Sequence, residues 1–307
     1  MNKKTRKKIK NWFIYIAVLI VVKLLRNMSR ISAIQMLRFC GALAYRLAKN
    51  ERNKTLRHLT WAFGDKLSPH EIEILAQNVF RHFSTVAADA IRLTVLLKQG
   101  LGTVVEGGKP GILDDLKQAK QGAILLTGHF GNWELLGAYL AQNGYPLKVV
   151  GTSAYDKRLD KMIVDTRNLA GYQNIARGKG TREIVRHLRD NGFLGILIDQ
   201  DTKVEGEFVN FFGRPAHTAT GPVMLAEKFS LPVIPMFMPL FPDLKYRIIT
   251  GEKIVLQNTG DARADAIANT QKCSDAYQDI ISRFPEQWVW MHERWKKQPQ
   301  DFVAGDE

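Results

Sequence analysis

Short apolar runs alternate with amphipathic segments through the central part of the chain. Runs with the length and composition of buried strands occupy residues 122–127, 147–151, 193–198 and 232–238. Segments with apolar residues at helical spacing occupy residues 111–120, 132–143, 158–170, 180–191 and 219–229. Because strands alternate with helices, the pattern predicts an α/β fold with a mainly parallel central sheet flanked by helices.

Longer segments frame this alternating region. Helical periodicity covers roughly residues 69–99, and Ser68 followed by Glu71 has the spacing of a capping box at its start. The stretch "KYRIITGEKIVL" (245–256) predicts two edge strands, and residues 261–283 predict a long C-terminal helix.

An apolar run near the N-terminus lies between basic residues. Trp12–Val22 comprises eleven consecutive apolar residues, which at ~1.5 Å per residue reach about half of a ~30 Å hydrocarbon core. A cleaved signal peptide is the alternative, but "KLLRNMSRIS" places bulky and charged residues where a small-residue cleavage site is needed. The run therefore predicts a retained N-terminal membrane-anchor helix that either spans the membrane or lies in its interface. The amphipathic stretch 31–47 either continues along the membrane or packs on the core.

The positive charge of the chain is concentrated before Leu59. Residues 1–58 contain fifteen Lys and Arg against one acid, Glu51, and this net charge of +14 equals that of the whole chain. The remainder holds 29 basic and 29 acidic residues, which argues against a nucleic-acid partner, because phosphate binding needs a basic excess. The charges divide the chain into a basic anchor region, 1–58, and a catalytic domain, 59–307.

The two cysteines, Cys40 and Cys273, lie far apart and have neither a CxxC nor a Cys/His zinc spacing. They predict no disulfide framework and no zinc site. We expect buried, reduced thiols and a cytoplasmic catalytic domain.

The motif "GHFGNWE" follows the apolar run 122–127 and opens the next helix. Ligands bind beyond the carboxyl ends of strands in parallel sheets, so His129 is predicted to lie at a binding crevice. Gly128 and Gly131 permit a sharp turn and close approach of a substrate. With His129 in the turn, Glu134 can reach back to one imidazole nitrogen and leave the other as a general base. The alternative is an ordinary helix cap beside a surface glutamate; the two glycines and the strand end favour catalysis.

No serine of the G-x-S-x-G type accompanies this pair. The histidine is therefore expected to activate a hydroxyl group that belongs to the substrate.

Two carboxylates follow another predicted strand. Asp199 and Asp201 come directly after residues 193–198, at the same ligand-binding edge of the sheet. No third ligand has a suitable spacing, so the sequence predicts no metal site. We expect the two carboxylates to orient substrate or support the structure, together with Arg167, or else to cap a loop.

Six basic residues lie within 23 positions: Arg167, Arg177, Lys179, Arg182, Arg186 and Arg189. Arginine clusters bind phosphate groups or acidic proteins through charge-assisted hydrogen bonds. Arg167, at a helix end, and Arg177, in "RGKG", are predicted to bind substrate. A solvated helix face explains the more distal arginines.

Two further segments have open roles. "NFFGRPAHTATGP" is expected to form part of the acyl or acceptor pocket, with Thr218 or Thr220 capping the following helix. His217 within it either binds substrate or is a hydrogen-bonded loop residue. The tryptophans of "PEQWVWMHERWKK" either lie at a membrane interface or pack the C-terminal segment on the core.

Four blocks together carry a resemblance to a known family. "GHFGNWE", "DQD", "NFFGRPAHTATGP" and "PEQWVWMHERWK" resemble, in order, the bacterial lipid A biosynthesis lauroyl/myristoyl acyltransferase family, between about Arg52 and Lys297. That family is similar to the glycerol-3-phosphate acyltransferases with their His-x4-Asp motif. The resemblance therefore implies a glycerol-3-phosphate acyltransferase-like fold.

The resemblance also implies an activity. It implies transfer of a fatty acyl chain from an acyl carrier protein thioester to a hydroxyl of a membrane glycolipid, most closely a lipid A precursor, at the cytoplasmic face of the inner membrane. His129 would take the hydroxyl proton and Glu134 would support the imidazolium, with neither a metal nor another cofactor required. The residues expected to bind substrate are Arg167, Arg177, Asp199, Asp201 and Asn132.

One segment departs from the family pattern. Members often carry an Arg-Pro…Asn-Pro-like segment after the strand 147–151, where this chain has "GTSAYDKRLDKMI". Acyl length and acceptor are therefore left open, with another glycolipid or a glycosylated pigment lipid as the alternative acceptor. A membrane lipid-binding protein without catalysis is a further alternative, against which the intact His129/Glu134 pair argues.

Overall fold

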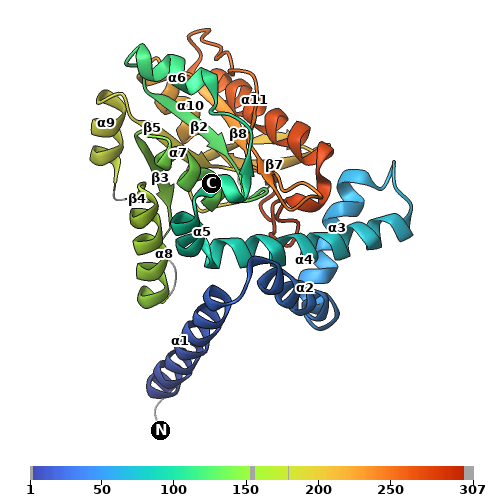
Figure 1. The fold of residues 1–307 in the computed structure, drawn as a ribbon. Coiled ribbons are helices and arrows are strands. Elements are labelled where there is room, and N and C mark those ends of the chain that lie inside the picture. The colour runs from blue at the N-terminus through green and yellow to red at the C-terminus, as the bar shows by residue number, and fades with distance from the viewer. Residues whose placement is uncertain (1–2, 153–155, 179, 301–307) are drawn as a thin grey trace.

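A six-stranded sheet forms the centre of the molecule (Figure 1). The computed structural model describes residues 3–152, 156–178 and 180–300. The strands lie in the order β10-β8-β2-β5-β3-β4, and their bounds are β2 Ala123–Thr127, β3 Leu147–Gly151, β4 Gln173–Ala176, β5 Phe193–Leu197, β8 Val233–Phe237 and β10 Ile249–Thr250. All neighbouring strands pair in parallel except β10, which pairs antiparallel with β8 at one edge. The predicted mainly parallel α/β sheet is confirmed.

Helices cover both faces of this sheet. They are α6 Gly111–Gln118, α7 Trp133–Gln142, α8 Lys157–Ala170, α9 Thr181–Arg189, α10 Gly221–Lys228 and α11 Ala262–Arg283. Side chains alternate between the faces: Ile124 and Leu126 pack with Tyr277 of α11, whereas Leu125 packs with Leu135 of α7. The centre of the sheet is thus covered by helices on both sides, which explains why its strands are continuous apolar runs.

In the described part of the chain, five α-helices precede α6: α1 Lys3–Asn27, α2 Arg30–Leu47, α3 Lys49–Phe63, α4 Pro69–Ile91 and α5 Leu93–Gln99. The predicted capping box at the start of α4 is present, with Ser68 accepting from the backbone of Glu71 and Glu71 accepting from Ser68. The helix expected to continue to residue 99 is interrupted at Arg92, and α5 begins at Leu93. Helix α3 runs across residue 58, the predicted boundary between the two regions.

The expected N-terminal helix is present, and Figure 1 shows α1 projecting away from the sheet, with its C-terminal end near α4. Among the helices of the described residues, none has the length and apolar content needed to cross a membrane. The membrane-spanning form of the predicted anchor is therefore not supported. The apolar run of α1 is short, and basic residues lie both before and after it.

Helix α2 packs on the core, which is one of its two predicted environments. Ala33 and Ile34 are buried against Leu25 and Ala88, so one side packs on the core. Phe39 and Leu47 on the same helix are 72% and 71% exposed. Packing accounts for only one side of α2.

Some elements were not predicted from the apolar pattern. Strand β4 is short and half-polar, and β6 Gly206–Phe211 pairs antiparallel with β7 Arg214–Ala219 outside the central sheet. The expected edge strands of residues 245–256 are reduced to β9 Tyr246–Arg247 and β10, and β9 pairs with β1 Val105–Glu106. Cys273 is buried as expected, but Cys40 is exposed on α2, which corrects its predicted burial.

Candidate active site

The turn between β2 and α7 positions His129. Gly131 adopts φ +55°, and a Cβ built on it would lie 2.2 Å from the carbonyl oxygen of Met238. A Cβ on Gly128 would lie 2.9 Å from the Tyr277 ring and 3.0 Å from Asp199 Oδ2. Both glycines are therefore needed for the sharp, closely packed turn, as the sequence predicted, whereas the close approach of a substrate stays a prediction. Asn132 ends the turn as the N-cap of α7, and its Oδ1 accepts a hydrogen bond of 3.0 Å from Leu135 N.

We expect Gly131→Ala to destabilise the protein by about 2–4 kcal/mol, because the new methyl group meets backbone that cannot move aside and the positive φ disfavours any side chain. Gly102→Ala is the matched control, because a Cβ there meets nothing within 4 Å. Denaturant unfolding measures both. A Gly131→Ala cost as small as that of Gly102→Ala would contradict this account of the turn.

Asp199 is the hydrogen-bonding partner of His129. Asp199 Oδ1 lies 2.9 Å from His129 Nδ1, and Asp199 Oδ2 accepts a hydrogen bond of 2.7 Å from the backbone N–H of His129. The Trp133 ring packs edge-on against the imidazole, with 5.2 Å between ring centroids. No described residue hydrogen-bonds Nε2, and the side chain of His129 is 29% exposed. The imidazole is therefore held at Nδ1, with Nε2 available to a substrate.

The surroundings of Asp199 favour its ionised form. Burial, the largest single effect, opposes ionisation, yet His129, the indole N–H of Trp288 at 2.9 Å and the backbone N–H together hold the pKa of Asp199 below its usual value. An ionised Asp199 accepts a hydrogen bond from the Nδ1–H of His129 and stabilises the imidazolium form.

Glu134 does not hydrogen-bond His129, so the predicted contact between these two side chains is wrong. Its carboxylate instead accepts hydrogen bonds from Arg167 Nη2 at 2.5 Å, Arg167 Nε at 2.9 Å and Tyr172 OH at 2.8 Å. Burial opposes ionisation of Glu134, but Arg167, Tyr172 and Trp133 outweigh it and lower the pKa of Glu134. Glu134 lies in the first turn of α7 and bonds Arg167 of α8, so the imidazole of His129 pairs with Asp199 instead.

The Glu134–Arg167 ion pair is mostly buried, with side chains 20% and 17% exposed. We expect Glu134→Gln or Arg167→Gln alone to cost about 2–3 kcal/mol, because each leaves a desolvated charge without its partner. The double substitution should cost less than the sum of the two, with a coupling of roughly 1–3 kcal/mol.

Urea unfolding of the four proteins in this cycle measures the coupling. Arg263→Gln is the control, because Arg263 pairs with Glu207 at an exposed position and should cost less than about 1 kcal/mol. Strictly additive costs for Glu134 and Arg167 would show that the bidentate pair contributes nothing.

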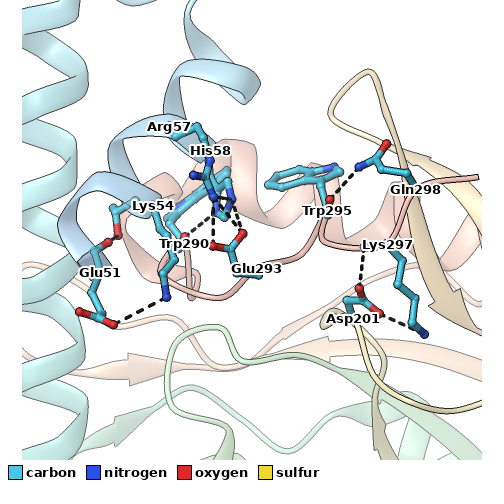
Figure 2. Close-up of polar contacts among 11 residues, drawn as sticks. Glu51, Lys54, Arg57, His58, Asp201, Trp290, Glu293, Trp295, Lys297 and Gln298 are labelled. Atoms are coloured by element: carbon cyan, nitrogen blue, oxygen red, sulfur yellow. Dashed lines mark hydrogen bonds and ion pairs between the residues drawn. The ribbon is translucent and has the colours of Figure 1, made fainter. Parts of the chain in front are cut away.

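Asp201 bonds the C-terminal segment and does not bond His129. Its Oδ2 accepts a hydrogen bond of 3.1 Å from the backbone N–H of Lys297, and its Oδ1 lies 3.4 Å from Lys297 Nζ (Figure 2). The same Oδ1 lies 3.6 Å from His217 Nδ1. His217 is buried. The pKa of His217 is lowered, first by burial and then by Lys297, which favours its neutral form.

The C-terminal tryptophans are part of the core. Trp288, Trp290 and Trp295 are buried, which decides between their two predicted environments in favour of packing. Figure 2 shows that helix α3 holds this segment: Arg57 donates to Glu293 at 2.9 Å, and His58 Nδ1 lies 2.8 Å from the Trp290 carbonyl oxygen. Because Trp288 also donates to Asp199, residues distant in sequence support the candidate base.

Trp288 is a site residue that the sequence did not predict. Its place in a tryptophan-rich block was the available signal, but its partner Asp199 is 89 positions away. Neither predicted cap of α10 forms: Thr220 occupies the N-cap without a side-chain hydrogen bond, and Thr218 Oγ1 donates to Ala216 O.

A cavity of about 570 Å³ opens beside His129 on the α7 face of the sheet. Apolar residues line its inner part, and they come from alternate positions of the strands and from α7: Leu125, Val149, Leu147, Met236, Leu136 and Leu140. Gly137 and Gly195 also line this space. The volume and lining are those of a ligand pocket that takes an apolar group.

Polar residues surround the outer part of the cavity. His129, Glu134 and Arg167 line it, together with Arg177 and Lys203. The predicted arginines Arg167 and Arg177 are thus brought to one cavity, although Arg167 is already paired with Glu134. Asn132, Asp199 and Asp201 are not among its lining residues. Within the described ranges, His, Cys, Asp and Glu side chains form no group of three arranged to hold a metal ion.

Fold and site together define an α/β protein with a carboxylate-supported histidine at the mouth of an apolar cavity. The chain belongs to the bacterial lipid A biosynthesis acyltransferase family, whose pattern matches residues 1–297. The predicted resemblance is confirmed, and the match extends across the N-terminal region as well.

Mycobacterial proteins are among its relatives. The phosphatidylinositol mannoside acyltransferase of Mycolicibacterium smegmatis is 24% identical over 190 residues, which are 58% of this chain and 58% of that protein. Proteins of the same name from two Mycobacterium tuberculosis strains, CDC 1551 / Oshkosh and H37Rv, are each 24% identical over 196 residues, 60% of this chain and 57% of theirs. The chain aligns with less than two thirds of the length of these relatives.

Proposed function

We propose that the protein transfers a fatty acyl chain from an acyl carrier protein thioester to a hydroxyl of a membrane glycolipid, with a lipid A precursor as the leading acceptor. The observation that carries this proposal is the His129–Asp199 pair at the mouth of an apolar cavity. Family membership supports the reaction class. A lipid-binding protein without catalysis would not need a buried carboxylate that hydrogen-bonds a partly exposed histidine.

In the proposed reaction, Nε2 of neutral His129 takes the proton of the acceptor hydroxyl as its oxygen attacks the thioester carbonyl. A tetrahedral intermediate forms and then collapses to the ester. The thiolate leaves and recovers the proton from the imidazolium. Asp199 stabilises the imidazolium between these steps, because its charge lies 2.9 Å from Nδ1. The reaction needs no covalent acyl-enzyme.

The inner, apolar part of the cavity is the proposed place of the donor's acyl chain. We expect Gly195→Val to shift the preferred donor to a shorter chain, because a Cβ on Gly195 enters the cavity 3.1 Å from Val149 Cγ1. Ile196→Val is the control, since Ile196 packs on the opposite face of the sheet. Competition among acyl carrier protein thioesters of graded length measures the shift. An unchanged chain-length profile would place the acyl chain elsewhere.

The acceptor is proposed to reach His129 from the inner membrane, with the catalytic domain on its cytoplasmic side. Helix α1 lies against α8, where Arg158 donates to the Asn11 carbonyl oxygen at 3.1 Å and its guanidinium stands 4.3 Å from the centre of the Tyr15 ring. Trp12 and Phe13 of α1 remain about half exposed or more. An interfacial helix next to the helix that carries Arg167 would hold the site close to a lipid surface.

A second acceptor has specific support. The mycobacterial relatives are named for phosphatidylinositol mannosides, so a phosphorylated mannoside is the alternative to a lipid A precursor. Arg177 and Lys203 at the cavity mouth suit phosphate groups of either acceptor.

The deciding experiment offers purified full-length protein both acceptors, each with acyl carrier protein or coenzyme A thioesters. Mass spectrometry of the lipids identifies the acylated product. Lipids of a deletion strain should lack the same acyl mass. Absence of transfer to either acceptor, together with an unchanged lipid profile in the strain, would overturn the proposal.

A further inference from the structure

A second cavity, of about 760 Å³, lies between α2 and α4, at the start of α3. Figure 1 shows α2 lying alongside α4, on the part of the molecule away from the sheet. Four arginines line this cavity: Arg38 and Arg46 from α2, Arg52 from α3 and Arg81 from α4. The groove belongs to helices that the proposed reaction does not use. We call it the α2–α4 groove.

The charges of the α2–α4 groove are not balanced. Its one acidic residue, Glu73, accepts a hydrogen bond of 3.3 Å from Tyr45 OH. In the described parts of the chain, none of the four arginines forms an ion pair with a carboxylate. The groove thus presents four guanidinium groups against one carboxylate that Tyr45 already engages.

Two of these arginines are close enough to repel each other. Arg38 is half-buried, and its Nε donates to Thr85 Oγ1 at 2.8 Å, which fixes the side chain. Burial and then the charge of Arg81 lower the pKa of Arg38. Neighbouring guanidinium groups in a concave space are stabilised by an anion that accepts hydrogen bonds from both, and phosphate oxygens have this geometry.

Apolar residues beside the groove indicate the source of the phosphate. Phe39 lines the groove and is 72% exposed, and Leu43 and Leu47 follow it on α2 with 46% and 71% exposed. Exposed apolar side chains next to a phosphate-binding pocket suit an amphiphile, because a lipid covers both. A free phosphate would leave the apolar side of α2 in water. An acidic protein would bind a flat basic face more readily than a concave groove.

We propose that the α2–α4 groove binds the phosphate head group of an anionic membrane phospholipid, whose acyl chains lie along Phe39, Leu43 and Leu47 of α2. The arginines hold the phosphate oxygens, and α2 lies in the interface with its unpacked side toward the lipid. This site would hold the protein on the membrane by a specific lipid contact, in addition to diffuse attraction by the basic N-terminal region. It does not depend on the proposed acyl transfer.

The test compares two triple variants of the full-length protein that lose the same formal charge. Arg46→Gln/Arg52→Gln/Arg81→Gln removes groove arginines but keeps Arg38, which bonds Thr85. Arg182→Gln/Arg186→Gln/Arg189→Gln removes three arginines from α9. Each protein is sedimented with vesicles of phosphatidylcholine alone, or of equimolar phosphatidylcholine and phosphatidylglycerol.

We expect the groove triple to raise the lipid concentration for half-maximal binding to the anionic vesicles on the order of 10²-fold. The α9 triple should raise it much less, and binding to neutral vesicles should change little in either. Equal losses of vesicle affinity in the two triple variants would show that diffuse electrostatic attraction explains the binding. That result would overturn the proposal. A groove triple that loses stabilisation by inorganic phosphate, yet keeps its vesicle binding, would assign the groove to a free anion and also overturn it.

Two further variants keep the test decisive if the groove triple folds poorly. Arg46→Lys/Arg52→Lys/Arg81→Lys keeps the charge but loses the planar fork, and it should bind the anionic vesicles with intermediate affinity. Phe39→Ser should weaken binding to the same vesicles, whereas Val255→Ser, at an equally exposed apolar residue, should not. Vesicle binding could instead stay unchanged in both the lysine triple and Phe39→Ser, while the KM for the carrier-linked donor in detergent is raised. This outcome would overturn the proposal and assign the groove to protein docking.

Discussion

Replacing His129 by alanine is expected to lower kcat for acyl transfer by about 10³-fold, because loss of a general base removes a factor on the order of 10²–10⁴. His129 lines the cavity with Nδ1 held by Asp199, and among the described residues no other histidine lines that cavity. The KM for the acyl donor should change little, because the apolar lining stays intact. Steady-state kinetics with an acyl carrier protein thioester measure both constants.

Two comparisons make the His129 result interpretable. His70→Ala removes an exposed histidine from the first turn of α4 and should leave kcat within a few-fold of wild type. His129→Gln keeps a side chain beside Asp199 and Trp133 without supplying a base, so its kcat should be as low as that of the alanine variant. Activity of His129→Gln near the wild-type level would remove the histidine from proton transfer.

The apolar pattern predicts the position of the site because parallel strands end at one edge. The ends of β2 and β5 bring His129 and Asp199 together, although they are 70 positions apart in sequence. The sequence predicted this edge for both residues separately, but it paired His129 with the wrong carboxylate. Proximity along the chain favoured Glu134, whereas adjacency of the two strands favours Asp199.

Glu134 shows why local spacing misleads here. Helix α7 begins at Trp133, so the direction of Glu134 is fixed by the first helical turn. In that direction the Glu134 carboxylate contacts Arg167 of α8 and Tyr172, which precedes β4. Their approach depends on how α8 packs on α7, and this packing has no signal in the spacing of the motif. The same limit applies to Trp288, whose contact with Asp199 depends on the path of the chain after α11.

The N-terminal region illustrates a different limit. Apolar spacing correctly indicated a helix over residues 31–47, but it does not state which apolar side meets protein. In α2, Ala33 and Ile34 pack against Leu25 and Ala88, whereas Phe39 stays exposed. Small residues permit the close approach of α2 to α4: Gly41 lies next to Ser84, and a Cβ there would be 2.0 Å from its hydroxyl oxygen. The size of the side chains, as well as their polarity, therefore decides which side of α2 packs on the core.

The second large effect is expected at Asp199. Asp199→Asn should lower kcat by about 10²–10⁴-fold, because an amide in this position no longer stabilises the imidazolium and can favour the wrong imidazole tautomer, as in Ser-His-Asp enzymes. Asp201→Asn is the matched control, two residues further along the same loop. Asp201 bonds Lys297 rather than His129, so its substitution should change kcat only a few-fold.

Stability as a function of pH gives an independent measurement for Asp199. Its pKa is lowered in the folded protein, so the ionised carboxylate contributes stability above its unfolded pKa of about 3.9, and this contribution is lost as the pH falls through the lower folded value. The difference in unfolding free energy between wild type and Asp199→Asn should therefore be largest near neutral pH and shrink in acid. Urea unfolding at several pH values measures this difference. If Asp201→Asn lowered kcat as strongly as Asp199→Asn, or if the stability difference for Asp199→Asn grew toward acid pH, the supporting carboxylate would have been assigned to the wrong residue.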